Sequence, residues 1–404
     1  MTALEKPRRI MLAAVEPSAD AIGASVIAEI KTLAPDTILT GCGGPLMARE
    51  GFETLFDIAP LSVVGFTDVI RAAPAAFKRA DDFAEAALRD KPDIAVLIDG
   101  WAFSRLVATR LKTLVPDLTV VKLAAPQVWA SRAERIKFVK DHFDAVLCLL
   151  PFEPAYFTRA GVHAEFIGNP NFQAAWRARG NGAAFRARHR LGETPVLAVM
   201  LGSRRSEVLR LAKPFAEGAA LLAGRIPGLR IVAPVAPSVD RLARSKLAQF
   251  AAAPVIVGAE EKNDAMAAAN VALTASGTAS TELAINRTPM VVAYRVDPLT
   301  AIWARSVMKT PFVSIINVAG GRFVIPELIQ EECNGPAIAG TLLPLFNDPH
   351  AYVEQASSFD TILKSLGVDG APAAALAATR ILEWASIGKA RVRGLHRLSS
   401  GPVS

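Results

Sequence analysis

Cysteine is scarce in this chain, and the positions of the few cysteines exclude two classes of small domain. The 404 residues include three cysteines, Cys42, Cys148 and Cys333, which lie far apart and form no Cys-x-x-Cys pair. An odd number of dispersed cysteines fits neither a disulfide framework nor a structural zinc site. The composition, 51% hydrophobic and 21% charged, instead predicts a chain that folds around a large apolar core.

Several catalytic motifs are also missing. The sequence contains no Gly-x-x-x-x-Gly-Lys-Ser/Thr loop, no Asp-x-Asp and no Gly-x-Ser-x-Gly, and its five histidines are scattered. These absences argue against a P-loop nucleotidase, a metal ion bridging a nucleotide diphosphate, and a hydrolase with a nucleophile elbow. We therefore expect neither a metal nor a cofactor, so any phosphate must be neutralised by arginine and by helix N-termini.

Long apolar runs are absent as well. No stretch of 18 uncharged apolar residues indicates a membrane span, and the apolar start of the chain is interrupted by Glu16 and Asp20. We expect a cytoplasmic protein. The net charge of +7 favours anionic partners, but three tyrosines and no basic arm argue against nucleic acid. A membrane surface and a nucleotide phosphate remain as candidate partners.

Short apolar runs alternate with segments of helical periodicity, and the pattern occurs twice. The first half has candidate strands at 9–15, 37–43, 93–99, 119–125, 145–151 and 164–170, and the second at 196–201, 230–235, 253–258, 271–276 and 290–294. Such alternation is typical of parallel sheets covered on both faces. We predict an α/β protein with two Rossmann-like domains facing a cleft. The expected ranges are 1–172, 173–355 and a helical segment 356–404 that returns to the first domain, with the polar stretch 173–193 as a linker.

Polar residues follow two strands of the second half. Gly202, Ser203, Arg204 and Glu207 come after the run 196–201, and Ser276, Gly277 and Thr278 come after 271–275, with Glu282 one turn later. Ligands in parallel sheets bind beyond the carboxyl ends of the strands, where glycine, backbone N–H groups and arginine suit a diphosphate. The alternative is a pair of ordinary capped helices with solvated arginines.

The first half offers carboxylates at the same kind of position. Glu16, Ser18 and Asp20 follow its first candidate strand, and Asp99 ends the run 93–99. A carboxylate at a strand end can serve as a general base, and Gly100 after Asp99 leaves room for a ligand. A helix-capping role is the alternative, above all for Asp20.

Taken together, these residues resemble those of the lipid A disaccharide synthase family, inverting and metal-independent glycosyltransferases of the two-domain GT-B architecture. The resemblance runs from about residue 8 to about residue 385. It is carried by Gly202-Ser203-Arg204-x-x-Glu207, Ser276-Gly277-Thr278-Ala279-x-x-Glu282, Leu150-Pro151-Phe152-Glu153, Ile98-Asp99, Pro289-Met290-Val291-Val292-x-Tyr294, and Asn317 followed by Pro326-Glu327-Leu328-x-Gln330.

The resemblance implies a reaction and roles for these residues. UDP-2,3-diacylglucosamine would donate its sugar to the 6-hydroxyl of 2,3-diacylglucosamine 1-phosphate, giving a β-1,6-linked disaccharide and UDP in lipid A biosynthesis. Asp99 would be the general base, and Arg204 with Ser203 and the 276–278 turn would hold the leaving diphosphate. Glu282 would bind ribose. Asn317, Glu327 and Gln330 would line the sugar-donor side, and Glu16, Ser18 and Asp20 the acceptor side.

The chain departs from the family pattern mainly in its first half. The family's Gly-Glu-x-Ser-Gly-Asp reads Val15-Glu16-Pro17-Ser18-Ala19-Asp20, and the second aspartate of Ile-Asp-x-Pro-Asp-Phe-Asn is Ala102. The sugar-donor motifs are better preserved than the acceptor motifs. Two alternatives therefore stay open: a relative that uses another acceptor or epimerises a UDP-sugar, and a relative that binds nucleotide without catalysis.

The lipid substrates imply contact with the cytoplasmic face of the inner membrane. Residues 65–83 combine Phe66, Val69, Ile70 and Phe77 with Arg71, Lys78 and Arg79, which suits a peripheral interfacial site. An ordinary amphipathic helix on the core is the alternative. Residues 299–312 form a second candidate site for membrane contact. The resemblance also leaves open that the protein forms a homodimer.

Overall fold

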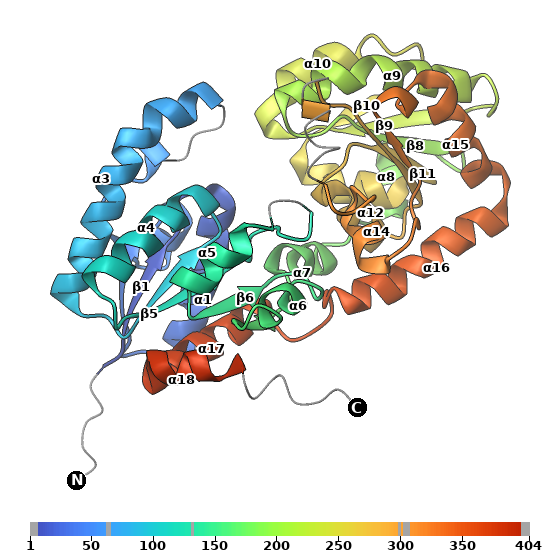
Figure 1. Ribbon diagram of the computed structural model, residues 1–404. Coiled ribbons are helices and arrows are strands. Elements are labelled where there is room, and N and C mark those ends of the chain that lie inside the picture. Colours follow the sequence, from blue (N-terminus) through green and yellow to red (C-terminus); the bar gives the residue numbers. More distant parts are fainter. Residues whose placement is uncertain (1–6, 62–65, 131–132, 298–299, 302–307, 397–404) are drawn as a thin grey trace. The chain divides into compact units, whose positions relative to one another are not determined.

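The computed structural model describes residues 7–61, 66–130, 133–297, 300–301 and 308–396. Two compact units divide the chain. Unit 1 comprises residues 1–170 and 370–404, and unit 2 comprises residues 171–369. The chain therefore leaves unit 1 once, passes through the whole of unit 2 and returns to unit 1 at residue 370 (Figure 1).

Unit 1 is built on a parallel sheet. Its order within the described residues is β3-β2-β1-β4-β5-β6-β7. The strands are β1 (Arg9–Ala13), β2 (Ile38–Cys42), β3 (Glu53–Thr54), β4 (Ile94–Ile98), β5 (Thr119–Leu123), β6 (Ala145–Cys148) and β7 (His163–Phe166). Every pairing is parallel, and β4 and β5 are buried throughout. Helices must therefore cover both faces of this sheet.

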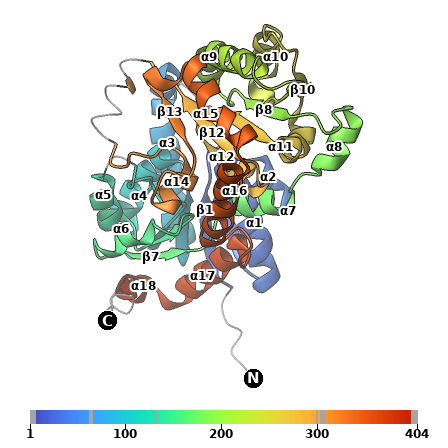
Figure 2. The same ribbon diagram turned by 90° about the vertical axis from the view of Figure 1, so that its right-hand side faces the viewer.

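Two helical layers supply that cover, and successive β1 side chains divide between them. Ile10 and Leu12 join the apolar core under α1 and α17, whereas Met11 and Ala13 join the core under α3 and α4. Figures 1 and 2 both show α17 beside α1. The helices of unit 1 are α1 (Pro17–Leu33), α2 (Pro45–Arg49), α3 (Phe66–Asp90), α4 (Trp101–Leu114), α5 (Arg135–His142), α6 (Pro154–Thr158), α17 (Ala373–Ile387) and α18 (Lys389–Gly394).

Unit 2 repeats this plan with a second parallel sheet. Its order in the described part of the chain is β10-β9-β8-β11-β12-β13. The strands are β8 (Val196–Met200), β9 (Arg230–Pro234), β10 (Val255–Val257), β11 (Val271–Thr274), β12 (Met290–Tyr294) and β13 (Glu327–Ile329). Leu197 and Val199 of β8 pack in one core with side chains of α9 and α15, and these two helices contact each other.

The helices of unit 2 lie before, between and after its strands. They are α7 (Pro170–Arg177), α8 (Gly182–Arg188), α9 (Arg205–Ala223), α10 (Asp240–Leu247), α11 (Lys262–Ala268), α12 (Thr278–Ile285), α14 (Ile315–Gly320), α15 (Gly335–Asn347) and α16 (Pro349–Ser365). Helix α16 contacts α12, α14 and α15, so it belongs to unit 2, and the return begins after it. The stretch 173–193, expected as a linker, instead contains α8, which packs on α11.

The strand order places one topological switch point in each unit. The chain turns to opposite sides of β1 to form β2 and β4, and to opposite sides of β8 to form β9 and β11. Loops at the carboxyl ends of the two strands beside such a point diverge and leave a crevice for a ligand. These loops contain residues 14–16 and 99–100 in unit 1 and residues 201–204 and 275–277 in unit 2. The predicted α/β class with parallel sheets is confirmed.

The two stretches considered for membrane contact lie partly outside the described residues. Residues 302–307 and the side chains of residues 66–72 are outside them. Residues 66–83 belong to α3, whose Phe77 side chain is 47% exposed. The guanidinium of Arg110 lies 5.7 Å from the centre of that ring. None of the helices that the structure describes combines the length and hydropathy needed to cross a bilayer.

Candidate functional site

Three polar residues of unit 1 meet at the crevice between β1 and β4. Glu16 is the residue before α1, Ser18 lies in the first turn of that helix, and Asp99 follows β4 directly. The Ser18 hydroxyl donates to Oδ2 of Asp99 over 3.4 Å. Asp99 is partly exposed, whereas the strand before it is buried. The predicted general base therefore reaches solvent from the end of a rigid strand.

The two carboxylates of this crevice influence each other. Burial raises the pKa of Glu16, the negative charge of Asp99 raises it further, and the positive charge of Lys122 lowers it. Like charges in one site resist simultaneous ionisation, so the positive charge of Lys122 offsets part of the effect that Asp99 has on the pKa of Glu16. The arrangement is suited to accept a proton from a hydroxyl group of a ligand.

Asp20, expected on the acceptor side, is buried and faces the start of α2. Its Oδ1 accepts hydrogen bonds from the backbone N–H groups of Gly44 (2.9 Å) and Met47 (3.1 Å), and its Oδ2 accepts one from Leu46 (2.9 Å). The side chain is 3% exposed. Asp20 thus caps a neighbouring helix, as the alternative reading allowed, although the capped helix is not its own. We assign it a structural role.

The loop after β8 is organised around a buried carboxylate. Oε2 of Glu207 accepts from the backbone N–H groups of Ser203 (2.9 Å) and Arg204 (3.1 Å), and Oε1 accepts from the Arg204 guanidinium (3.0 Å) and from the Tyr294 hydroxyl (3.2 Å). Gly202 has a φ of +94°, and a Cβ atom there would lie 2.3 Å from Oε2 of Glu207. The loop requires glycine at this position because the carboxylate occupies the space.

This geometry separates the residues that hold the loop from those that a ligand can reach. The Glu207 side chain is 5% exposed, and that of Arg204 is 71% exposed. Ser203 is also exposed. Glu207 therefore holds the loop, while Arg204 and Ser203 present a guanidinium and a hydroxyl to an anion at the start of α9.

The loop after β11 lies beside the loop after β8. The N–H of Ala275 donates to the carbonyl of Met200 over 3.1 Å, which joins the ends of the two strands. Gly277 precedes α12 with a φ of +143° and nothing within 4 Å of an added Cβ position. Gly277 and Thr278 are exposed, so the backbone at the start of α12 is open to an anion.

Two further predicted residues, Ser276 of this loop and Glu282 of α12, make contacts within unit 2. The hydroxyl of Ser276 donates to the carbonyl of Val313 over 3.0 Å. Oε1 of Glu282 accepts a hydrogen bond from the Lys262 ammonium at 2.7 Å. A ribose hydroxyl that binds Glu282 must share this carboxylate with Lys262.

Asn317, expected to line the sugar-donor side, is fully buried, and its amide group is saturated by the protein. Its Nδ2 donates to the carbonyl of Ile325 (2.8 Å) and to Glu327 (2.7 Å), and its Oδ1 accepts from the N–H groups of Val324 (2.8 Å) and Ile325 (2.9 Å). The exposed fraction of the residue is 0%. We therefore assign Asn317 to the support of the loop before β13.

Glu327 and Gln330 also support backbone. Glu327 accepts from the N–H groups of Val313 and Ser314, both at 2.9 Å. The Gln330 amide pairs with the backbone of Val296, accepting from its N–H at 2.7 Å and donating to its carbonyl at 3.3 Å. With the Ser276 contact to Val313, these residues connect the turn before α12 to β13. Both residues are half-buried, and these contacts are to the backbone of neighbouring loops.

Four residues of these crevices were not singled out from the sequence as site residues. Ser238 donates to the carbonyl of Ser203 at 2.8 Å, and Tyr294 donates to Glu207. In unit 1, Ser104 and Lys122 donate to the carbonyl of Asp99 at 2.7 Å and 2.6 Å. The lysine has a signal in the sequence, because it interrupts the apolar run of β5. Tyr294 stands in one of the motifs of the resemblance, whereas the two serines have no such signal.

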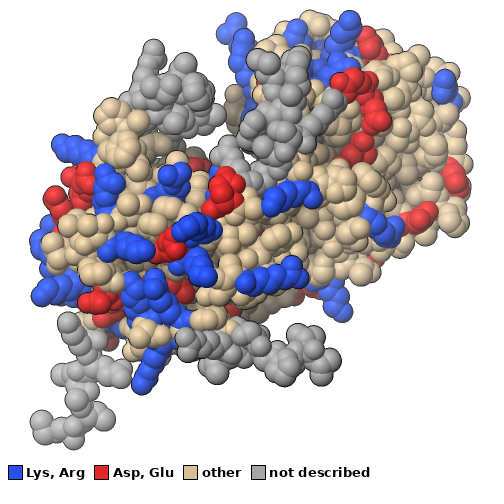
Figure 3. All heavy atoms as spheres, viewed as in Figure 1, with Lys and Arg blue, Asp and Glu red and all other residues tan. Residues whose placement is uncertain are grey.

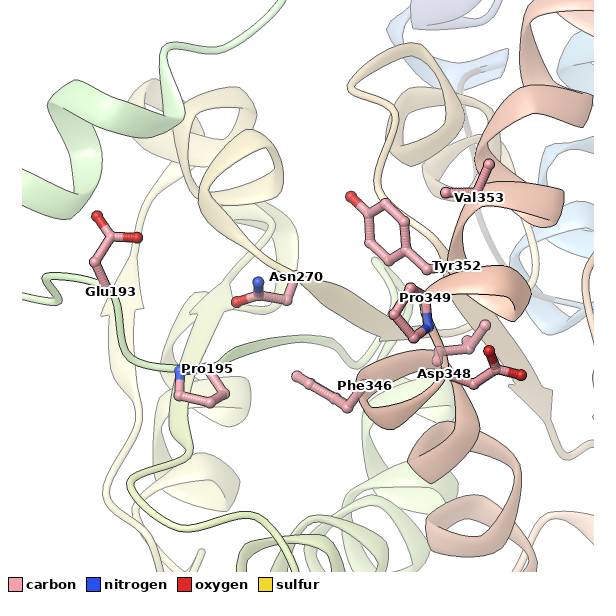
Figure 4. Close-up of a pocket in the computed structure, with 9 residues that line it drawn as sticks. Glu193, Pro195, Asn270, Phe346, Asp348, Pro349, Tyr352 and Val353 are labelled. Atoms are coloured by element: carbon pink, nitrogen blue, oxygen red, sulfur yellow. The ribbon is translucent and has the colours of Figure 1, made fainter.

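A pocket in unit 2 lies at the opposite end of the sheet from these loops. Figure 4 shows its residues converging from the starts of β8 and β11 and from the junction of α15 with α16. The lining includes Pro195, Asn270, Phe346 and Tyr352. Oδ1 of Asn270 already accepts from the N–H of Val196 and from Arg186, both at 2.8 Å. The pocket is separate from the crevice between β8 and β11.

The described residues contain no group of three or more His, Cys, Asp or Glu side chains placed to hold a metal ion. The groups in unit 2 that suit a phosphate are instead cationic or neutral. They are the Arg204 guanidinium, the Ser203 hydroxyl and the exposed backbone at Gly277 and Thr278. This chemistry fits an anionic ligand such as a nucleoside diphosphate.

Comparison with known proteins gives a consistent result. Residues 10–379 match the sequence profile of the family described as lipid-A-disaccharide synthetase. A curated lipid-A-disaccharide synthase of Gluconobacter oxydans (strain 621H) is 36% identical over 374 residues, which cover 92% of this chain and 89% of the relative. Another, of Rhodospirillum centenum, is 35% identical over 380 residues, covering 93% and 94% of the two chains.

Solved structures share the fold at much lower identity. The UDP-GlcNAc 2-epimerase of Methanocaldococcus jannaschii, in complex with UDP-GlcNAc and UDP, is similar with a TM-score of 0.56 at 12% identity, covering 94% of this chain and all of that one (100%). This similarity concerns the fold alone.

Proposed function

The chain belongs to the lipid-A-disaccharide synthase family, a family of glycosyltransferases, and we propose that it transfers the sugar of UDP-2,3-diacylglucosamine to 2,3-diacylglucosamine 1-phosphate. The acceptor's 6-hydroxyl oxygen attacks C1 of the donor sugar from the face opposite the diphosphate. The bond between C1 and the phosphate oxygen breaks, UDP leaves, and the hydroxyl proton passes to the enzyme. The product is a β-1,6-linked disaccharide with inverted configuration at C1.

Asp99 is the proposed proton acceptor. Its carboxylate is partly exposed at the end of β4 and lies beside Ser18, whose hydroxyl donates to it at 3.4 Å. Glu16 stands next to it with a raised pKa. General-base assistance of this kind contributes about 10²–10⁴-fold to a rate. We propose that Glu16 and Ser18 orient the acceptor around Asp99.

The crevice between β8 and β11 is the proposed UDP site, and its geometry is the observation that carries this proposal. An exposed guanidinium and two exposed turns at helix N-termini surround the ends of two adjacent strands. Arg204 neutralises the charge that grows on the leaving diphosphate, and Ser203, Gly277 and Thr278 donate to its oxygens. Glu282 accepts from ribose. Glu207, Ser276, Asn317, Glu327 and Gln330 hold these loops in place.

We further propose that the enzyme reaches its lipid substrates at the cytoplasmic face of the inner membrane through a basic surface of unit 1. Figure 3 shows Lys and Arg side chains over α4, α5 and α18. The three helices are adjacent on this surface, because Lys112 of α4 donates to the carbonyl of Asp141 of α5, and Lys389 of α18 donates to the carbonyl of Pro116, just after α4. Basic side chains near an anionic leaflet contribute about 1 kcal/mol each.

The test is an assay with radiolabelled UDP-2,3-diacylglucosamine in the presence and absence of the acceptor phosphate. We expect disaccharide and UDP in equal amounts, and only when the acceptor is present. Conversion of the UDP-sugar without acceptor would support an epimerase instead. Binding of UDP-sugar without any turnover would support a relative that lacks catalysis, and turnover with another acylated sugar would indicate a changed acceptor.

A further inference from the structure

Strand β5 contains a buried charge. Its sequence is Thr-Val-Val-Lys-Leu, all five residues are buried, and the lysine, Lys122, is 1% exposed. Lysine is almost never fully buried unless its ammonium group is bonded, because an isolated charge in an apolar interior is costly. The strand tolerates it, so the surroundings of the ammonium group must compensate for this cost.

The compensation comes from three backbone carbonyls at the ends of β4 and β5. Nζ of Lys122 donates to the carbonyl oxygens of Asp99 at 2.6 Å, Leu97 at 3.1 Å and Leu123 at 3.2 Å. An ammonium group has three N–H donors, and here each has an acceptor. All three acceptors are main-chain atoms, one in β4 (Leu97), one in the residue that follows β4 (Asp99) and one in β5 (Leu123).

The backbone that Lys122 holds is in an unfavourable conformation. Asp99 has a φ of +44°, and Ala124, across from it on the next strand, has a φ of +65°. Residues with a side chain seldom adopt positive φ, and each such residue costs about 1–3 kcal/mol unless its surroundings impose it. The carbonyl of Asp99 accepts from both Lys122 and the Ser104 hydroxyl, which lies 2.7 Å away. These two donors fix the turn that directs the Asp99 carboxylate outward.

We propose that Lys122 is a positioning residue for Asp99: it holds the strained turn of the general base and places a positive charge beside the two carboxylates of the crevice. This inference rests on the proposed function, because it assumes that Asp99 accepts the acceptor's proton. Under this proposal, a residue of a core strand affects the reaction although it contacts neither substrate.

The electrostatics of the crevice support this assignment. Burial lowers the pKa of Lys122 to about 7, against the opposing effects of the negative charges of Asp99 and Glu16. Among the described residues these two carboxylates are the charged groups that act on the lysine, one after β4 and the other before α1. In return, Lys122 lowers the pKa of Glu16. The pKa values of Lys122 and Glu16 are therefore coupled to each other, and both respond to the charge of Asp99.

The first experiment compares Lys122→Met with Ser104→Ala in the disaccharide assay between pH 5 and pH 9. Both variants remove a donor to the Asp99 carbonyl, but only the first removes a charge. We expect Lys122→Met to lose at least about tenfold in kcat, and the acid limb of its pH profile to move up by about one pH unit. The KM for the UDP-sugar should stay within about twofold, because its proposed site lies in unit 2. Ser104→Ala should leave the acid limb in place.

A merely structural lysine gives a different result. Lys122→Met would then lower the melting temperature, but the kcat per folded molecule and the acid limb would match those of the wild type. That outcome would overturn the inference. An acid limb that moves equally in Ser104→Ala would also overturn it, because the charge would then not be the cause.

A second measurement does not depend on turnover or on the folding of Lys122→Met. In protein labelled with ¹³C at the lysine ε-carbon, we expect one NMR resonance to titrate near pH 7. In Asp99→Asn this titration should shift down by about one pH unit, because the attraction that favours the charged ammonium is lost. If no such resonance exists, or if it does not move in Asp99→Asn, the inference fails. If the resonance moves but no disaccharide forms in the wild type, the proposed function fails while the coupling of Lys122 to Asp99 is retained.

Discussion

Units 1 and 2 place a buried carboxylate in the first turns of the helix that follows their first strand, but the two carboxylates hold different parts of the fold. Asp20 of α1 reaches across to three backbone N–H groups at the start of α2. Glu207 of α9 turns back to the N–H groups of Ser203 and Arg204 in its own loop. The loop after β8 is therefore fixed by a side chain of its own helix, whereas the carboxylate of Asp20 accepts its hydrogen bonds from the start of α2.

This difference indicates how each unit is built for its proposed ligand. In unit 2 the proposed binding surface is the loop itself, so a rigid loop would present Arg204 and backbone N–H groups in a fixed arrangement. In unit 1 the important group is a single carboxylate, Asp99, and the rigid element is the turn after β4, which Lys122 and Ser104 hold through its carbonyl. A fixed anion site and a fixed base can thus be built on the same topology by different contacts.

The largest effect that would test this comparison concerns the base. We expect Asp99→Asn to lower kcat by about 10³-fold and to leave the KM for the UDP-sugar within a few-fold, because asparagine cannot accept the proton. Steady-state kinetics at pH 7.5 would measure it. Asp36→Asn is a matched control, since Asp36 is an exposed carboxylate of unit 1 that lies before β2. Near-normal kcat in Asp99→Asn would remove Asp99 from the proposed mechanism.

The next effect concerns the anion site of unit 2. We expect Arg204→Ala to lower kcat/KM by about 10²-fold, because the growing charge on the diphosphate loses its cation. Titration calorimetry should show weaker UDP binding as well. Arg205→Ala is the control, because Arg205 is the exposed neighbouring residue at the start of α9. Equal losses in the two variants would mean that the total positive charge at the start of α9, and not the position of Arg204, determines binding.

A pair of glycine variants compares the loop after β8, which Glu207 holds, with the loop after β11, which is exposed at Gly277. Gly202→Ala places a Cβ atom 2.3 Å from Oε2 of Glu207, whereas the Cβ of Gly277→Ala meets nothing within 4 Å. Both positions have positive φ, which costs an alanine about 1–3 kcal/mol. Because the clash adds to this strain, we expect unit 2 to lose about 3 kcal/mol of unfolding free energy in Gly202→Ala and about 1–2 kcal/mol in Gly277→Ala. Urea denaturation would measure both losses. A larger loss in Gly277→Ala would contradict the inference that the Glu207 carboxylate fills the space beside Gly202.

The fold and the location of the crevices could be predicted from the sequence because both depend on local signals. Apolar runs located the strands to within a few residues, and each predicted loop lies at a carboxyl end of a strand beside a switch point. The short β3 and β13 were missed. They contain two and three residues, too few to show a period.

The division between residues that touch a ligand and residues that hold a loop could not be predicted. Asn317 and Glu282 both occur in motifs with well-preserved spacing, but only the structure reveals that Asn317 is fully buried and saturated. The same holds for Lys122, whose three acceptors lie 25, 23 and 1 residues away in the chain. Spacing identifies residue type and helix face, whereas burial depends on elements that are distant in sequence.

The smallest expected effects test the opening contrast between Asp20 and Glu207. Asp20→Asn and Glu207→Gln each exchange a charged acceptor for a neutral amide, which should cost about 2 kcal/mol of stability in either unit. The consequences for binding should differ, since Asp20 holds α2 and Glu207 holds the loop that contains Arg204. We expect Glu207→Gln to weaken UDP binding several-fold and Asp20→Asn to leave it unchanged.

Hydrogen–deuterium exchange localises the two losses. Faster exchange should appear at Gly44, Leu46 and Met47 in Asp20→Asn, and at Ser203 and Arg204 in Glu207→Gln, because the charged carboxylate that these amides bond is replaced by a neutral amide with one acceptor oxygen. If Glu207→Gln bound UDP normally while its loop amides exchanged faster, then a rigid loop would not be needed for the anion site. The loops of the two units would then be held by different contacts, but ligand binding would not require this difference.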